Sequence, residues 1–363
     1  MIRIGIVGIG DISGIYLKNL TNMFHNVKIL AVCDLVREKA LKAVEEYKIP
    51  KIYDTMEELF LDNEIDLVLN LTRPYEHYEV SKAALKAGKH VYSEKPLAAT
   101  YAQGVELVQL AEENNLYLGG APDTFLGAGI QTCRKLIDDG FIGKVVGAAA
   151  FMICHGHESW HPDPEFYYKH GGGPMMDMGP YYLTALTNLI GGIKSVTGVA
   201  KTSFEERTIT SKQKYGEIIK VEVPTYITGI MEFDNGAVGT LFTTFDVHNI
   251  GQARFEIYGS EGTLIVPDPN TFGGPIYLLR PEDRALKEMP LMFDYSDNSR
   301  GLGLEDMALA IKEQKLARAS YKQTLHVLEA MEAFVTSSNS RMAVDLQTKF
   351  KREEAIERKV TYK

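Results

Sequence analysis

Cysteine is scarce in this sequence, and its spacing shows no pairing. The 363 residues contain three cysteines, Cys33, Cys133 and Cys154, and no Cys-x-x-Cys motif. An odd number without paired spacing argues against a disulfide framework and is typical of a protein in a reducing compartment.

Long hydrophobic runs are also missing. No apolar stretch approaches the roughly 18 residues that are needed to span a bilayer. The first residues, MIRIGIVGIGD, lack the basic segment and the long apolar segment of a signal peptide. We therefore expect a cytoplasmic protein that has no membrane partner.

Positive charge is not in excess. The formal net charge is −9, whereas nucleic acids bind clustered cations, so we expect no nucleic-acid partner. The apolar fraction of 45% and the charged fraction of 24% are those of an ordinary globular protein. A chain of 363 residues suits two domains.

The first residues follow a strand–turn–helix pattern. Residues 2–7 are a β-branched run typical of a buried parallel strand, and GIGDISG at 8–14 precedes a helical pattern. In this context the first glycine allows a tight turn, and the second lets the backbone approach a pyrophosphate at the helix N-terminus. Ser13 replaces the usual third glycine and is small enough for close packing. The predicted cofactor-binding residues of this turn are Gly8, Gly10, Asp11, Ile12 and Ser13.

An acidic residue follows the second predicted strand, residues 27–33. Asp34 lies 24 residues after Gly10, close to the spacing of the acid that binds the adenosine ribose. A carboxylate there repels a 2′-phosphate, so the sequence favours NAD over NADP, although Arg37 is placed to accommodate a phosphate. The alternative is that Asp34 only caps the helix that begins near Arg37.

Helices and strands alternate after Asp34. The predicted helices are 54–60, 76–87 and 101–114, and the predicted strands are 65–71, 90–92 and 116–118. This alternation predicts a doubly wound parallel sheet, which binds ligands beyond the carboxyl ends of its strands. The loops expected there add further cofactor-binding candidates: Thr72, Arg73, Pro74, His77, Glu94 and Lys95. A purely structural role at a helix start is equally open for His77.

The chain becomes rich in β-strand patterns after residue 122. We predict a cofactor-binding domain at 1–122 and an α+β domain at 123–363 that binds substrate and mediates oligomerisation. Its predicted strands are 144–154, 218–233, 237–245, 252–258, 263–266 and 276–279. Asp-Asn-Gly at 234–236 is a hairpin signal, so strands that meet there should be antiparallel. A large sheet with one helical layer leaves a face that self-association would cover, which predicts a homodimer or homotetramer.

Several of these segments resemble the Gfo/Idh/MocA oxidoreductase family. They are GIGDIS at 8–13 with Asp34, DLVLNLTRPYEHYEVSKAALKAGKHVYSEKPLA at 66–98, GGGPMMDMGPYY at 171–182, RGLG at 300–303 and the helix around 326–329. The resemblance implies an N-terminal Rossmann domain and a C-terminal domain with a large, open, mostly antiparallel sheet. It also implies NAD(P)-linked oxidation or reduction of a sugar, polyol or glycoside.

Hydride transfer from a carbinol carbon requires a group that takes up the hydroxyl proton. Lys95, held by Pro96 at the end of a predicted strand, is one candidate, and the resemblance assigns it to the catalytic site. Burial can lower the pKa of a lysine toward the working range. The alternative is a surface ion pair between Lys95 and Glu94.

Asp177 and Tyr181 are further catalytic and substrate-binding candidates. They lie four residues apart and would share one face of a helix. Pro180 fits a helix only near its start, which places Asp177 at or before the first turn and leaves an N-cap as the alternative. Many family members carry a histidine acid/base at the position of Tyr181. Tyr181 could therefore serve in proton transfer, in substrate binding or in packing, and the sequence leaves these three roles open. The alternative is that Tyr182 faces the site instead.

The loop at 155–168 contains the only tryptophan and three histidines. Aromatic rings pack well on the C–H surfaces of sugars, so we expect substrate contacts from Trp160, His161 and Tyr167, in addition to Lys95, Asp177 and Tyr181. His155 and His157 would share a face if extended, but histidines in a polar loop more often contact solvent or substrate than metal. We expect no metal.

The sequence thus predicts an NAD-dependent dehydrogenase or reductase that acts on CH–OH groups. A cofactor-binding sensor or regulatory protein without turnover is the alternative. The tyrosine at position 181 favours that alternative, whereas Lys95 and Asp177 argue against it.

Overall fold

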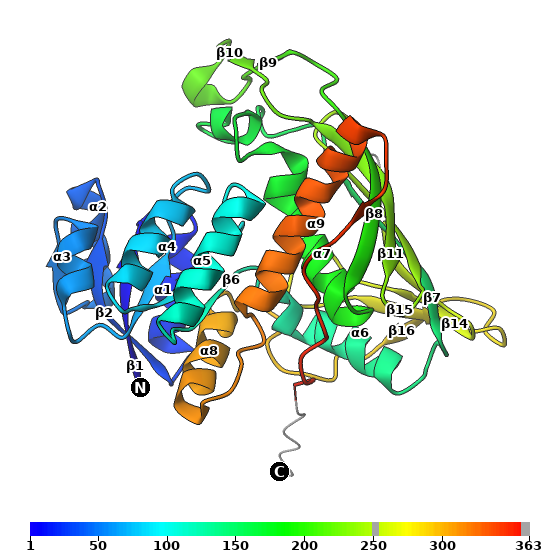
Figure 1. Cartoon of the computed structure of the whole chain (residues 1–363), viewed down its shortest axis with the longest axis horizontal. Helices are drawn as coiled ribbons and strands as arrows, with labels where there is room; N and C mark the ends of the chain where they lie inside the picture. Colours follow the sequence, from blue (N-terminus) through cyan, green and yellow to red (C-terminus); the bar gives the residue numbers. More distant parts are fainter. Residues whose placement is uncertain (249–253, 357–363) are drawn as a thin grey trace. The chain divides into compact units, whose positions relative to one another are not determined.

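The computed structural model describes residues 1–248 and 254–356, which fall into two compact units (Figure 1). Unit 1 comprises residues 1–123 and 298–328, and unit 2 comprises residues 124–297 and the chain from 329 onward. The sequence assigns 298–328 to the second domain, but the structure groups this segment with unit 1. Contacts between residues about 280 positions apart decide this grouping: the Asn19 amide donates to the backbone carbonyls of Asn298 and Arg300.

Unit 1 is built on a parallel sheet with the strand order β3-β2-β1-β4-β5-β6. Its strands are β1 (Ile2–Val7), β2 (Val27–Cys33), β3 (Lys51–Tyr53), β4 (Leu67–Asn70), β5 (His90–Ser93) and β6 (Leu118–Gly120). Every neighbouring pair is parallel, which confirms the predicted doubly wound sheet. The sequence pattern misses β3, because a three-residue edge strand carries almost no periodicity.

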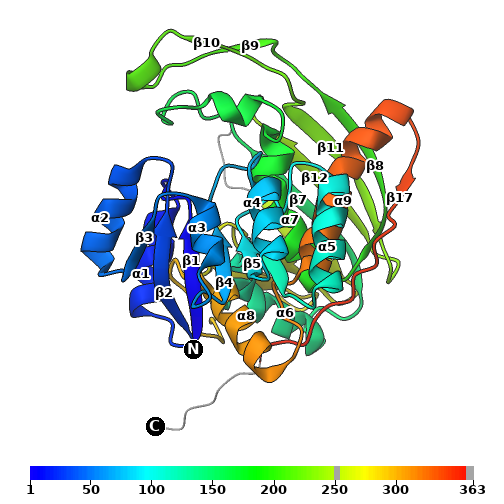
Figure 2. The ribbon, with the colours of Figure 1, turned by 60° about the vertical axis from the view of Figure 1, so that its left-hand side comes forward.

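Five helices of unit 1 alternate with these strands along the chain (Figures 1 and 2). They are α1 (Ser13–Asn22), α2 (Arg37–Tyr47), α3 (Met56–Leu61), α4 (His77–Lys86) and α5 (Tyr101–Glu113), and a sixth helix, α8 (Leu302–Glu313), comes after β16 (Lys287–Met289) in the chain. Helix α3 begins with a capping box. The Thr55 side chain accepts a hydrogen bond from the Glu58 backbone N–H, and the Glu58 side chain accepts one from the Thr55 backbone N–H. Ile4 and Ile6 of β1 are fully buried, as the apolar run predicts.

Unit 2 is built on a large sheet with the order β16-β15-β14-β13-β7-β12-β11-β8-β17 in the described residues. The strands are β7 (Val145–Ile153), β8 (Ile193–Lys201), β11 (Tyr226–Phe233), β12 (Val238–Thr244), β13 (Arg254–Gly259), β14 (Gly262–Ile265), β15 (Ile276–Leu279), β16 (Lys287–Met289) and β17 (Val344–Asp345). In the described residues, all strand pairings of this sheet are antiparallel except that of β7 with β12. The mostly antiparallel sheet and the hairpin at 234–236 are confirmed.

One predicted strand of unit 2 is wrong in extent. The segment 218–233 forms two strands, β10 (Ile218–Lys220) and β11, and β10 pairs instead with β9 (Glu206–Thr208) in a separate two-stranded sheet. Pro224 lies between them and has no N–H to donate to a sheet, which explains the break. The predicted strand 252–258 corresponds to β13, and its residues 252 and 253 lie outside the described part of the chain.

Helices cover one face of the large sheet. They include α7 (Gly173–Leu189) and the C-terminal part of α9 (Tyr321–Ser340), and α6 (Ala128–Asp138) packs on α7. Unit 2 also contains the 3-10 helices η1 (Thr124–Leu126), η2 (Glu165–Tyr168) and η3 (Lys212–Lys214), of which η3 lies between β9 and β10 in the chain. Helix α7 packs on β7, β11 and β12, and the backbone of Gly198 on β8 donates to Ser337 of α9 (Figure 1). Leu183 and Leu186 of α7 are fully buried there.

A buried carboxylate holds the start of α8 in unit 1. Asp123 Oδ2 accepts hydrogen bonds from the backbone of Gly301 (2.8 Å) and Gly303 (3.0 Å). Burial raises the pKa of Asp123 to about 6, although both hydrogen bonds act in the opposite direction.

Asp123→Asn should remove a pH-dependent part of the stability. The folded chain keeps a proton on Asp123 up to pH about 6, whereas an unfolded aspartate loses it near pH 4. Because the folded state binds the extra proton, the free energy of unfolding from this group falls by about 2 to 3 kcal/mol as the pH rises from about 4 to about 6. Urea unfolding followed by circular dichroism across this window measures the effect. Equal pH dependence in wild type and variant would contradict the assignment.

Candidate functional site

The turn between β1 and α1 has the geometry of a phosphate-binding turn. Gly8 has a φ of +96°, and a Cβ there would meet the Leu71 carbonyl at 2.8 Å, whereas a Cβ at Gly10 would meet nothing within 4 Å. The Ser13 hydroxyl donates to the Gly10 carbonyl (2.7 Å), which braces the turn. No side-chain hydrogen bond caps the N-terminus of α1, and its first turn holds no acidic residue. Backbone N–H groups and the positive helix end there suit an anionic phosphate.

The rest of the predicted turn is accessible. Asp11 is exposed and Ile12 is half-buried. These two residues connect Gly10 to the first residue of α1, so the predicted members of the turn lie together in the structure.

Asp34 lies beside this turn at the end of β2. Its Oδ2 accepts from the backbone of Ile9 (2.6 Å), and its Oδ1 accepts from the backbone of Val36 (2.7 Å). Helix α2 has Val36 as its N-cap and no side-chain cap, so the alternative in which Asp34 caps this helix is wrong. Arg37 forms an ion pair with Asp54.

A buried histidine joins two loops at the same edge of the sheet. His77 Nδ1 lies 2.7 Å from the Pro96 carbonyl, and its Nε2 lies 3.0 Å from the Thr72 carbonyl. Burial lowers the pKa of His77. Asn70, at the end of β4, accepts from the Thr72 hydroxyl (2.6 Å) and donates to the His77 carbonyl (3.1 Å). His77 thus holds backbone at both loops, and the exposed Arg73 and half-buried Pro74 lie at their rim.

The side chain of Glu94 holds the turn formed by residues 94–96. Glu94 is 8% exposed, and its carboxylate accepts from the Tyr16 hydroxyl (2.8 Å) and from the backbone of Lys95 (2.9 Å). Glu94 is therefore an internal brace and not half of a surface ion pair. Lys95 is half-buried, with its backbone held by Glu94 on one side and, through Pro96, by His77 on the other.

Helix α7 carries Asp177 in unit 2. The helix begins at Gly173 with Gly172 as its N-cap, so the N-cap alternative for Asp177 is wrong. Pro180 lies inside the helix, which also overturns the expectation that it marks the helix start. A proline there removes one backbone hydrogen bond at a cost of about 3 kcal/mol. The burial of every residue from 179 to 189 offsets this cost.

Asp177 faces the imidazole of His157, which is not among the predicted substrate-binding residues. Nε2 of His157 lies 3.4 Å from Asp177 Oδ2, and the two side chains are 13% and 16% exposed. The His157 ring contacts Tyr167, with ring centres 4.1 Å apart, and Trp160, at 5.2 Å. His161 is half-buried next to Trp160, whose side chain is 61% exposed. The structure therefore brings the predicted rim residues together around a histidine near Asp177.

The two tyrosines after Asp177 have different surroundings. Tyr181 is 7% exposed and follows Asp177 by four residues on α7. Tyr182 is 1% exposed, and its ring lies 5.9 Å from that of Phe255 on β13. Tyr182 is therefore a core residue, and burial raises the pKa of its phenol.

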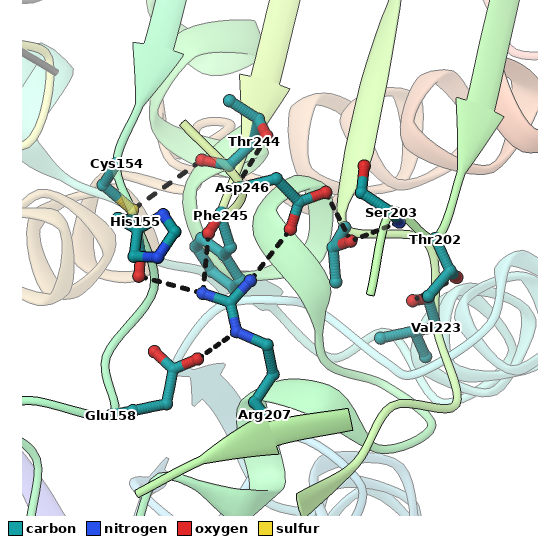
Figure 3. A network of polar contacts seen from close by, with 11 residues as sticks. Cys154, His155, Glu158, Thr202, Ser203, Arg207, Val223, Thr244, Phe245 and Asp246 are labelled. Carbon is teal, nitrogen blue, oxygen red and sulfur yellow. Dashed lines mark hydrogen bonds and ion pairs between the residues drawn. The ribbon is translucent and has the colours of Figure 1, made fainter. Parts of the chain in front are cut away.

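A buried arginine from β9 holds the segment that carries His157 (Figure 3). Arg207 Nη2 donates to the backbone carbonyls of His155 (2.9 Å) and Phe245 (3.0 Å), and Nη1 lies 3.1 Å from Asp246. Its Nε pairs with the Glu158 carboxylate. Nothing local in the sequence signals this cluster, because its members lie up to 91 positions apart. The three nearby histidines were the only available hint.

A cavity of about 570 Å³ is lined in part by this cluster. Its lining includes His155, Glu158, Ser159, Glu206, Thr208 and His248. The rings of His155 and His248 stack with centres 3.6 Å apart, and burial together with the nearby Arg207 charge lowers the pKa of His155.

Metal sites and membrane spans are not found in the described ranges. Residues 1–248 and 254–356 contain no cluster of three or more His, Cys, Asp or Glu side chains that could hold a metal ion. None of the helices within the same ranges has the length and apolarity needed to cross a bilayer.

The two glycines of the β1–α1 turn should separate folding from cofactor binding. Gly8→Ala should lower the thermal stability by more than about 1 kcal/mol, because the new Cβ clashes with Leu71 at a positive φ. Gly10→Ala should unfold like wild type, because a Cβ there meets no protein atom. It should bind NADH at least about tenfold more weakly, because the Cβ would occupy the space where the pyrophosphate approaches the backbone. Thermal unfolding and fluorescence titration with NADH measure the two effects. Wild-type NADH affinity in Gly10→Ala would contradict this placement of the pyrophosphate.

Comparison with known proteins finds two family models in succession. "Oxidoreductase family, NAD-binding Rossmann fold" matches residues 2–119, and "GFO/IDH/MocA C-terminal domain" matches residues 130–265. The inositol 2-dehydrogenase/D-chiro-inositol 3-dehydrogenase of Lactiplantibacillus plantarum is 35% identical over 39% of this chain and 41% of its own length.

Two longer matches extend over most of the chain. The D-glucoside 3-dehydrogenase of Escherichia coli is 28% identical over 67% of this chain and 70% of its own. The solved structure of a levoglucosan dehydrogenase with NADH and levoglucosan covers 96% of this chain and 99% of its own, with a TM-score of 0.81 and 20% identity, and so shares the fold. The family models confirm the predicted resemblance: the chain belongs to the GFO/IDH/MocA oxidoreductase family, and the NAD-binding Rossmann fold of that family lies in its first unit.

Proposed function

We propose that this protein is an NAD-dependent oxidoreductase that transfers hydride between nicotinamide and a carbinol carbon of a sugar, polyol or glycoside. The observation that carries the proposal is the half-buried Asp177 among aromatic and histidine side chains, in a chain whose other unit is an NAD-binding domain. Carboxylates accept hydrogen bonds from hydroxyls, and aromatic rings cover C–H surfaces. The names of the inositol and glucoside dehydrogenases among its relatives support this substrate class.

The residues at the edge of unit 1 fit NAD better than NADP. Asp34 holds a carboxylate at the β1–α1 turn, where it accepts from the Ile9 backbone and would accept from ribose hydroxyls. The Arg37 guanidinium is paired with Asp54 instead of being left to a 2′-phosphate. The turn residues Gly8, Gly10, Asp11, Ile12 and Ser13 would hold the pyrophosphate, and Thr72, Arg73, Pro74, His77 and Glu94 would line or support the remainder of the site.

The chain's own residues handle the substrate and its proton. Bound NAD supplies the hydride acceptor or donor. We assign Lys95 and Asp177 to the group that binds the carbinol hydroxyl and handles its proton, because the backbone of Lys95 is held on both sides and Asp177 lies on a buried helix. Tyr181 binds a neighbouring hydroxyl. Trp160, His161 and Tyr167 form the rim that packs on the sugar ring.

A panel of sugars, polyols and glycosides assayed with NAD and NADP tests the proposal through the absorbance of the reduced cofactor. Lys95→Met keeps the apolar stem and removes the charge, and it should lower kcat at least about 100-fold on the best substrate. Lys86→Met, which changes an exposed lysine of α4, should be indistinguishable from wild type. Full turnover by Lys95→Met would refute the assignment. Tight NADH binding with no turnover on any compound would favour the sensor alternative.

We also propose that the protein self-associates through the open face of its large sheet. Val146, Val199, Ile230 and Val238 are each about half exposed or more (49–61%) on β7, β8, β11 and β12. Rings on the same strands contact one another in series: Tyr226 lies 4.7 Å from Phe242, which lies 6.1 Å from Phe151. An apolar sheet face of this kind is suited to pairing with a second copy, as a homodimer or within a homotetramer.

A charge introduced on the open face of the large sheet should dissociate the oligomer. Ile230→Lys should convert the oligomer to monomer, because two-fold pairing would bury the new ammonium groups. Leu41→Lys, at a similarly exposed leucine of α2, should leave the mass unchanged. Size-exclusion chromatography with light scattering reads out both variants. A wild-type chain that elutes only as monomer would overturn the proposed self-association.

We propose the cytoplasm as the location. All three cysteines are free thiols in the structure, with Cys33 and Cys133 buried. Unpaired thiols of this kind persist in a reducing compartment.

A further inference from the structure

The cavity of about 570 Å³ in unit 2 is distinct from the predicted substrate site of that unit. Its lining comes from β9 and the residues around it, from the segment that follows β7, and from His248 after β12. The described lining includes none of the substrate-binding candidates of unit 2, which are Trp160, His161, Tyr167, Asp177 and Tyr181. Sites for small molecules have volumes of about 300 to 1,000 Å³, so the cavity offers unit 2 a second place where a small ligand fits.

The ring of Phe204 supplies a flat apolar surface at this cavity. The residue is 46% exposed, and the centre of its ring lies 5.4 Å from the guanidinium carbon of Arg207. Attraction between the ring and the buried cation restrains the side chain, so a ligand that packs on the exposed part of the ring orders little that is mobile. An exposed aromatic ring is suited to the C–H face of a sugar.

The charges in the lining argue against an anionic ligand. Among the described lining residues Arg207 is the only lysine or arginine. Its three guanidinium nitrogens all pair with protein groups: Nε with the Glu158 carboxylate, Nη1 with Asp246, and Nη2 with two backbone carbonyls. The lining also includes Glu206, which is exposed. A phosphate or a carboxylate in the cavity would meet this negative charge while the guanidinium is already engaged.

Side chains that form hydrogen bonds in both directions complete the lining. Ser159 and Thr208 are exposed and carry hydroxyls, and the imidazoles of His155 and His248 stack with their centres 3.6 Å apart. Burial, with the nearby guanidinium charge, lowers the pKa of His155, so its ring is neutral at pH 7 and has one donor and one acceptor nitrogen. Ligand hydroxyls match such groups, because each hydroxyl both donates and accepts.

We propose that this cavity is a second ligand site of the protein and that it binds a neutral monosaccharide or disaccharide. The sugar ring packs on Phe204, and its hydroxyls form hydrogen bonds with the carboxylate of Glu206, the hydroxyl of Thr208 and the imidazole of His155. No bond of the sugar is made or broken there. The site goes beyond the proposed hydride transfer, because neither the cofactor nor Asp177 takes part in it.

Isothermal titration calorimetry on the full chain without cofactor tests the binding. The probes are glucose, methyl β-D-glucopyranoside, maltose and cellobiose, and at least one should bind saturably with a Kd on the order of 1 mM or tighter. Phe204→Ala should raise that Kd at least about tenfold, because the packing surface is lost. Thr208→Val keeps the shape without the hydroxyl and should raise it about threefold or more.

The matched control is Tyr215→Ala. It removes a ring that is 77% exposed in the connection between β9 and β10 and that is not part of the described lining, so its Kd should equal that of wild type. Circular dichroism and thermal unfolding establish that each variant is folded, and the milder Thr208→Val keeps the test decisive if Phe204→Ala does not fold.

Histidine resonances locate the bound sugar. In ¹⁵N-histidine-labelled protein, the ring resonances of His155 and His248, assigned through His155→Gln and His248→Gln, should move during the titration because both rings line the cavity. The resonances of His170, an exposed histidine of the same unit outside the described lining, should stay in place.

The outcomes separate this inference from the proposed function. No saturable binding of any probe up to a concentration on the order of 100 mM overturns the second site. Binding that survives in Phe204→Ala and Thr208→Val but is lost in Asp177→Asn places the sugar at Asp177 and overturns it as well. A chain that binds sugar at His155 and His248 but oxidises no carbinol compound supports the second site and contradicts the proposed function. An active chain without a response of these histidines overturns the second site alone.

Discussion

The buried guanidinium of Arg207 is the constraint on which the arrangement of the unit 2 site depends. Its side chain is 6% exposed and lies between the carboxylates of Glu158 and Asp246, which are 8% and 3% exposed. A charge at this depth has to be paired, and removal of one partner of such a pair typically costs about 3 to 5 kcal/mol. The network therefore ties β9, the segment after β7 and the end of β12 into one arrangement (Figure 3). Because His157 lies within that segment, its position opposite Asp177 depends on this charge cluster.

The edge of unit 1 that carries the predicted cofactor site is held in a different way. It is held by hydrogen bonds between backbone and buried polar side chains: Asp34 to the β1–α1 turn, His77 to two loops, and Glu94 to Tyr16 and the Lys95 backbone. Each of these side chains forms a hydrogen bond with at least one backbone group of a loop at this edge. A nucleotide-binding edge of this kind is preorganised, which lowers the entropic cost of ordering loops when a ligand binds.

Much of the fold could be predicted from local pattern. The alternation in residues 2–120 specifies a parallel sheet because buried parallel strands are short apolar runs and amphipathic helices have a different period. The glycine turn and Asp34 could be located because their spacing is measured along the chain. The local sequence pattern was insufficient where a proline or a contact remote in sequence decides where a helix or strand begins and ends. Pro180 lies inside α7 because burial of the helix offsets one lost hydrogen bond, and β10 leaves β11 because it pairs with β9.

The sequence by itself determined the fold class and singled out the glycine turn and Asp177 as candidate site residues, since each of these depends on residues that are close along the chain. Only the tertiary structure decided which imidazole faces Asp177. The sequence pointed to position 181, where a tyrosine stands on the same helix face, whereas the structure brings His157 to Asp177 from 20 positions earlier. That contact is set by Arg207, 50 positions after His157, and by Asp246, 89 positions after it. Such long-range pairing of buried charges leaves no periodic or motif-like signal, because it depends on distances in space and not along the chain.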